Sequence, residues 1–126
     1  MIKSMDISVW GREFTLPVFY DCYQGESVIE EQILMVYWFI ANQHWLLEAK
    51  SRVVSYCRTE VMEDARNQKK DNIFSYVKPE CLFVKRDGKR PRIALMCKYR
   101  YDPEHGLAVV FSCDGSISVG SQDIIL

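Results

Sequence analysis

The segment Arg92–Tyr101 constrains the fold of this chain most, because its side chains fall into two alternating sets. One set is Ile93, Leu95, Cys97, Tyr99 and Tyr101, and the other is Arg92, Ala94, Met96, Lys98 and Arg100. Successive side chains of a β-strand point to opposite faces of the sheet. The pattern therefore predicts a strand with one face against helices and an opposite face that is cationic and solvated.

Further strands are predicted on both sides of this one. Turn signals at Asp87-Gly88, at Pro103-Glu104-His105-Gly106 and at Asp114-Gly115 separate short apolar segments, which are Cys81–Arg86, Leu107–Cys113 and Ile117–Val119. Near the N-terminus, Asp6–Val9 and Glu13–Tyr23 read as a hairpin around Trp10-Gly11. Pro17 cannot donate to a strand ladder, so the second of these strands is expected at a sheet edge or with a bulge.

The middle of the chain has helical periodicity. Val28–Ala41 follows Ser27, a predicted N-cap that Glu30 completes as a capping box. Its apolar stripe is Ile29, Ile33, Val36, Tyr37 and Ile40, and Trp38 falls off it. A second stretch, about His44–Ala65, has its own stripe of Leu46, Ala49, Val53, Tyr56, Cys57 and Val61. Asn42-Gln43 is a possible break, and the pattern leaves open whether residues 28–65 form one kinked helix or two.

These elements predict one α+β domain spanning residues 1–126. We expect an antiparallel β-sheet of about five to six strands with one or two long α-helices packed on one face, in the order β-β-α-(α)-β-β-β-β. Arg66–Asn72 is a polar connector within this domain. The apolar share of 48 % fits a folded globule.

The cysteines and the N-terminus indicate a cytoplasmic protein. Five cysteines occur without a CxxC pair, and most lie in apolar segments, as reduced core thiols do. The N-terminus lacks the apolar stretch of a signal peptide. The longest apolar run, Ile33–Ala41, is far shorter than the roughly twenty residues that a membrane-spanning helix needs.

Charge is strongly segregated along the chain. Residues 1–48 hold two Lys/Arg and seven Asp/Glu, residues 49–100 hold fourteen and six, and residues 101–126 hold none and four. Segregated charge says little about fold but indicates a charged partner. The candidate contact residues are the acids and the histidine of the last segment: Asp102, Glu104, His105, Asp114 and Asp123.

Three interpretations of these residues stay open. Asp-Pro and His-Gly are ordinary turn residues, so a structural turn is the first. Contact with a partner is the second, and a metal site or an acid/base pair at Asp102, Glu104 and His105 is the third. No motif of a catalytic nucleophile, phosphate loop or metalloprotease is present, and no cofactor is predicted.

The run Lys85–Arg100 carries seven cations. It reads first as a solvated sheet face, then as a contact for an acidic protein or for a second copy, and last as a nucleic-acid patch. The acidic segments on both sides oppose the nucleic-acid interpretation, because they would repel the same phosphates.

Four segments resemble a known bacterial family: LPVFYDCYQGE, NIFSYVKPECLFVKR, RIALMCKYRYDPEHGLAVVF and VGSQDIIL. The family consists of small cytosolic proteins that recur among the immunity proteins of contact-dependent inhibition and other polymorphic toxin systems. The resemblance covers most of the chain outside the helices. It implies stoichiometric protection by binding a toxin domain, and it carries over no catalytic residue.

The sequence therefore predicts a non-enzymatic immunity protein that binds a cognate toxin C-terminal domain and occludes it. An acidic surface suits this role, because toxin domains that attack nucleic acid are generally basic. The alternatives are an interaction module or homodimer unrelated to toxins, and a metal-dependent enzyme using the Asp102/Glu104/His105 turn. Membrane and nucleic acid are not expected partners.

Overall fold

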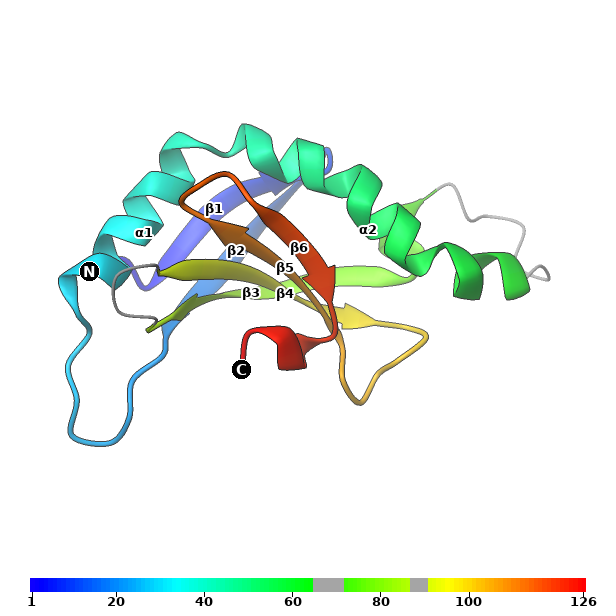
Figure 1. Cartoon of the computed structure of the whole chain (residues 1–126). Coiled ribbons are helices and arrows are strands. Elements are labelled where there is room, and N and C mark those ends of the chain that lie inside the picture. Colours follow the sequence, from blue (N-terminus) through cyan, green and yellow to red (C-terminus); the bar gives the residue numbers. More distant parts are fainter. Residues whose placement is uncertain (65–71, 87–90) are drawn as a thin grey trace.

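A computed structural model describes residues 1–64, 72–86 and 91–126 of the chain. In these ranges six strands form a single sheet, two α-helices cross it, and two short 3₁₀ helices follow α2 and β6 (Figure 1). In chain order the elements are β1 (Ser4–Val9), β2 (Arg12–Tyr20), α1 (Glu30–Ala41), α2 (His44–Glu63), η1 (Ile73–Ser75), β3 (Val77–Lys85), β4 (Arg92–Tyr99), β5 (Leu107–Ser112), β6 (Ile117–Gly120) and η2 (Gln122–Ile124). The α+β class and the element order are as predicted.

The sheet is mixed, which corrects the expectation of a purely antiparallel one. The strands lie in sequence order, and four neighbouring pairs of described strands are antiparallel, but β2 and β3 are parallel. The reason is the crossover between them: α1 and α2 carry the chain across the sheet before β3 starts (Figure 1). Such a helical connection returns the next strand in the same direction.

The helical region consists of two helices. α1 ends at Ala41, where Asn42 donates from Nδ2 to the carbonyl oxygen of Trp38 at 2.8 Å, and α2 starts at His44. The predicted Ser27–Glu30 capping box is wrong. The N-cap is Ile29, whose N–H donates a hydrogen bond to Oε1 of Gln32 at 3.1 Å. The helix therefore starts at Glu30, later than the predicted Val28.

The two helices bury different proportions of their predicted stripes. α2 buries Leu46, Ala49, Val53 and Cys57 as expected, although Tyr56 stays exposed. Of its predicted row, α1 buries Val36, while Tyr37 is 54 % exposed; the other buried residues of α1 are Gln32, Met35 and Phe39. The packing of Phe39 against Phe111, with ring centroids 5.3 Å apart, sets this rotation of α1 on the sheet.

The face of the sheet away from the helices is covered by the C-terminal tail rather than by water alone (Figure 1). The side chain of Ile125 packs there with those of Ala94, Met96, Ala108 and Val110, all of them buried. The predicted cationic, solvated face of the Arg92–Tyr101 strand is therefore wrong at its centre. Ile125 lies twenty-six residues beyond the end of β4 at Tyr99, and no local pattern predicts its return to this face, because the contacts of the tail are non-local.

β2 changes partner along its length. Its first part pairs with β1 up to Pro17, and only Val18, Phe19 and Tyr20 pair with β3. β2 lies between β1 and β3, so the expected edge position is wrong for the strand as a whole. Pro17 itself lies one residue before the ladder to β3 begins, where its missing N–H costs no hydrogen bond to β3. β3 has an irregularity between Pro79 and Cys81, at which Glu80 is an extra residue with no partner in β4.

Parts of two predictions lie outside the described residues: most of the Arg66–Asn72 connector and the Asp87-Gly88 turn. Within the described ranges, neither α1 nor α2 combines the length and the apolar character that a bilayer crossing requires.

Candidate functional site

The loop between β4 and β5 is a compact turn fixed by main-chain hydrogen bonds. The N–H of Asp102 donates to the carbonyl oxygen of Tyr99 at 3.2 Å, and the N–H of Gly106 donates to the carbonyl oxygen of Asp102 at 2.8 Å. Gly106 has a φ of +63°, a region that favours glycine. Asp102 caps the turn, because its Oδ1 accepts from the N–H of His105 at 3.3 Å.

The 3₁₀ helix η2 docks against this turn. The N–H of Gln122 donates to the carbonyl oxygen of His105 at 3.0 Å, and its Nε2 donates to the carbonyl oxygen of Cys97 at 3.1 Å. A Cβ on Gly106 would lie 2.6 Å from that Nε2, so the glycine is required for this close approach. The docking places Asp123, next to Gln122, near the turn.

Four of the five candidate residues therefore lie at one end of the sheet. We call Asp102, Glu104, His105 and Asp123 the turn cluster. The Nδ1 of His105 lies 3.0 Å from Oδ1 of Asp102, and the two side chains are 48 % and 39 % exposed. This hydrogen bond and the charge of Asp102 raise the pKa of His105, and the charges of Glu104 and Asp123 add to the rise.

Asp114, the fifth candidate, lies elsewhere. It sits in the turn after β5, at the opposite end of that strand from the turn cluster (Figure 1). Its Oδ1 accepts from the N–H of Ser116 at 2.8 Å, and the neighbouring Gly115 lies against Trp45 of α2. A strand of six residues separates the two turns by roughly 17–20 Å, so one small contact cannot include both.

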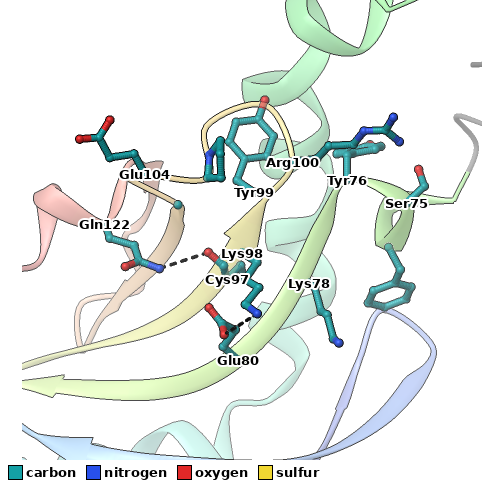
Figure 2. A pocket seen from close by; sticks show the side chains of 13 residues that line it. Ser75, Tyr76, Lys78, Glu80, Cys97, Lys98, Tyr99, Arg100, Glu104 and Gln122 are labelled. Carbon is teal, nitrogen blue, oxygen red and sulfur yellow. Dashed lines mark hydrogen bonds and ion pairs between the residues drawn. The ribbon is translucent and has the colours of Figure 1, made fainter. Parts of the chain in front are cut away.

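A hollow of about 570 Å³ lies beside the turn cluster, over the ends of β3 and β4 (Figure 2). Glu104 and Gln122 border it on the side of the turn, and Lys78 and Lys98 border it on the side of the strands. Its volume is within the range of about 300–1,000 Å³ that is usual for small-molecule sites.

Two lysines stand directly opposite each other at this hollow. Lys78 of β3 and Lys98 of β4 are register partners in the antiparallel ladder, and both side chains are exposed. Like charges in this position destabilise a sheet. The alternation in Arg92–Tyr101 placed Lys98 on the correct face of its strand. The neighbouring strand was predicted to start at Cys81, however, and β3 starts at Val77, so Lys78 lay outside the predicted strand and the pair was missed.

Among its described residues, 85–86 and 91–100, the basic run Lys85–Arg100 does not form one cationic strip. At one end, Lys85 lies 3.4 Å from a carboxylate oxygen of Asp21, and Arg86 lies 3.3 Å from one of Glu26. At the other end is Lys98, and buried apolar residues of β4 lie between. The fold thus pairs acids of the first segment with bases of the second, and the segregation seen along the sequence is partly cancelled in space.

The buried thiols of Cys57 and Cys97, the second of which lines the hollow, are poor nucleophiles. Burial raises the pKa of the Cys57 thiol to about 11, and burial also raises the pKa of Cys97 well above its usual value. Across residues 1–64, 72–86 and 91–126, no group of three or more His, Cys, Asp or Glu side chains is placed to hold a metal ion. This includes the Asp102, Glu104 and His105 side chains that were one candidate for a metal site.

Comparison with known proteins identifies the domain type. A family model described as a domain of unknown function (DUF6985) matches residues 2–126. No curated protein and no solved structure matches the chain.

Proposed function

The chain belongs to the DUF6985 family, a domain family of unknown function, and from its geometry we propose that it is an immunity protein. It binds one cognate toxin C-terminal domain, occludes the surface that the toxin needs, and performs no catalysis. It acts in the cytoplasm, where the toxin arrives. The resemblance of four segments to immunity proteins of polymorphic toxin systems supports this proposal.

The main support for this proposal is that the turn cluster brings acidic side chains together at one end of the sheet. Asp102, Glu104 and Asp123 bring three carboxylates to one end of the sheet from two separate segments. Main-chain hydrogen bonds within the turn and from Gln122 hold the backbone in place, so the turn loses little conformational entropy when a partner binds. An exposed acidic cluster attracts basic proteins over long range and speeds their association.

The cysteines agree with a binding role in a reducing compartment. All five lie in the described part of the chain, and none of them forms a disulfide. Burial keeps Cys57 and Cys97 protonated, which suits core thiols rather than reactive ones.

Co-purification with toxin domains tests the proposal. Tagged protein is mixed with toxin C-terminal domains from the same strain, and the captured domain is identified by mass spectrometry. We expect one toxin domain at a 1:1 ratio and rescue of growth when both are expressed. If folded, abundant bait captures no toxin domain, the immunity function is rejected.

Paired charge reversals then locate the contact. Asp102→Lys combined with Glu104→Lys is expected to slow association and to weaken the complex at least about tenfold, because attraction becomes repulsion. The matched control is Glu48→Lys combined with Asp114→Lys, which makes the same change in net charge away from the turn cluster. Equal losses in both variants would mean that the net charge of the protein, not the turn cluster, governs binding.

Self-association is the second candidate, because the same molecule exposes an acidic turn cluster and a lysine pair at Lys78 and Lys98. Two copies could join these surfaces. Sedimentation at low and high salt distinguishes this candidate, because a dimer held by charge dissociates as salt screens it. A monomer at every salt concentration removes it.

A further inference from the structure

We propose that the hollow over the ends of β3 and β4 binds a small molecule bearing a phosphate or carboxylate group. This inference goes beyond the immunity function and does not depend on it. The site is formed by the lysine pair Lys78 and Lys98, by Arg100, and by aromatic side chains at the wall (Figure 2).

The two lysines of the pair repel each other in the unliganded protein. Side chains that are directly opposite in an antiparallel ladder have Cβ atoms only about 4.5–5.5 Å apart, and two like charges there repel. Lys78 and Lys98 hold this arrangement at the hollow. An oxyanion placed between the two ammonium groups would turn the repulsion into two charge-assisted hydrogen bonds.

Two carboxylates border the hollow, those of Glu80 and Glu104, and they do not neutralise the pair: Glu104 forms no ion pair with either lysine. Glu80, the extra residue of β3, lies 3.7 Å from Nζ of Lys98, and these two side chains are 41 % and 70 % exposed. An ion pair as exposed as this one contributes little free energy. For Lys78, the described residues provide no ion-pair partner at all.

Arg100 adds a third cation to the lining of the hollow, beside Tyr76 (Figure 2). It follows β4 directly, and its N–H donates to the carbonyl oxygen of Tyr76 at 2.9 Å, which extends the ladder by one step and fixes its backbone. No carboxylate among the described residues pairs with its guanidinium. Arginine is well suited to phosphate and carboxylate, because its planar donors bind both oxygens.

The remaining wall explains why the ligand is a small molecule with a flat or apolar part. Phe74 and Tyr76 border the hollow beside the cations. On the opposite side, Gln122 is fixed by its hydrogen bond to the carbonyl oxygen of Cys97, so this wall is built into the fold. A hollow of about 570 Å³ accommodates a ligand of modest size.

NMR titration of the full-length protein tests the inference with three matched probes. Phenyl phosphate and benzoate carry the two anionic groups on one ring, and phenol carries the ring alone. We expect phenyl phosphate or benzoate to shift the amide signals of Lys78, Tyr99 and Arg100 saturably, and phenol to leave them unchanged. The anion that binds more tightly identifies the ligand group.

A double substitution checks that the cations cause the binding. Lys78→Gln combined with Arg100→Gln is expected to raise the Kd of the preferred probe at least about tenfold, the loss of roughly one strong charge-assisted contact. Lys50→Gln combined with Arg58→Gln, on the exposed side of α2, removes the same charge elsewhere and is expected to leave the Kd unchanged. Unchanged amide spectra away from the hollow show that both variants are folded.

Three results would overturn the proposed anion site. No saturable shift at these amides with either anion overturns the inference. Binding of phenol as tight as that of the anions, or equal Kd values in the two double variants, also overturns it, because the cations would then have no role. Each of these results leaves toxin binding unaffected, since that is measured with a different partner.

Discussion

The side-chain Nε2 of Gln32 on α1 donates to the carbonyl oxygen of Val84 near the end of β3, at 3.1 Å, although fifty-two residues separate the two in sequence. The same nitrogen donates to the carbonyl oxygen of Asp21 at 3.0 Å, and Oε1 accepts from the N–H of Ile29. Gln32 is completely buried. One side chain thus joins the start of α1, the segment after β2 and the end of β3.

We expect Gln32→Leu to destabilise the fold strongly. The substitution keeps the volume similar but removes three hydrogen bonds, and the carbonyl oxygen of Val84 retains only its bond from the N–H of Asp21, at 2.9 Å. The expected loss is about 2–3 kcal/mol in the free energy of unfolding. Urea denaturation measures it, with Gln24→Leu in the exposed loop before α1 as the control. A loss below that of the control variant would show that water replaces the side chain.

Lys78→Glu is expected to stabilise the protein while removing anion binding. The change replaces a repulsive cross-strand pair by an attractive one with Lys98, worth about 0.2–1 kcal/mol. Residues kept for binding often lower stability in this way. Thermal unfolding in a buffer without phosphate or carboxylate measures the effect. A decrease in Tm would mean that Lys78 makes a favourable contact in the unliganded protein.

The ionisation of His105 is expected to report on the turn cluster. The hydrogen bond and the charge of Asp102 raise the pKa of His105 above about 6.5, its value in an unfolded chain. A group with a raised pKa stabilises the folded state fully below its unfolded pKa, and that contribution disappears as the pH rises through the folded pKa. The contact is therefore stronger at pH 5 than at pH 8.

NMR titration of the His105 ring checks this expectation. Asp102→Asn should lower the pKa of His105, because it removes the carboxylate that causes the rise. Asp114→Asn, at the opposite end of β5, should leave it unchanged. If both substitutions shift it equally, the rise comes from the general charge of the protein and the proximity of Asp102 has no special effect.

The thiols are expected to differ widely in reactivity. Cys113 is exposed and should react rapidly with an aromatic disulfide reagent at pH 8. Cys57 and Cys97 are buried, and burial raises the pKa of both, so they should react only when the chain unfolds. Cys113→Ser should remove the rapid phase. Rapid labelling of Cys57 or Cys97 in the native protein would show that α2 opens from the sheet.

Local patterns predicted most of the elements, and non-local packing decided the rest. The alternation in β4 and the turn residues around it depend on neighbours in sequence, so these strands were predicted closely. The rotation of α1 was not, because Phe39 meets Phe111 from β5 and Gln32 meets β3. A sequence with apolar residues on nearly every side of the helix gives no preference between the two rows.

The candidate site was also predicted only where its residues are close in sequence. Asp102, Glu104 and His105 are close in sequence, so their proximity followed from a single turn. Asp123 joined them only through η2, and Asp114 was separated by the length of β5. The Lys78–Lys98 pair was missed, because the predicted strand starts at Cys81, whereas β3 extends back to Val77 past the irregularity at Glu80.

The short parallel junction of β2 and β3 has a consequence for the order of folding. Only three residue pairs form it, and Val18 meets Leu82 across sixty-four residues of chain. The strands β3 to β6 each pair with their neighbour in sequence, so this part closes only short loops. We therefore expect the C-terminal half to assemble first. The N-terminal hairpin, although it leaves the ribosome earlier, then docks last and sets the folding rate.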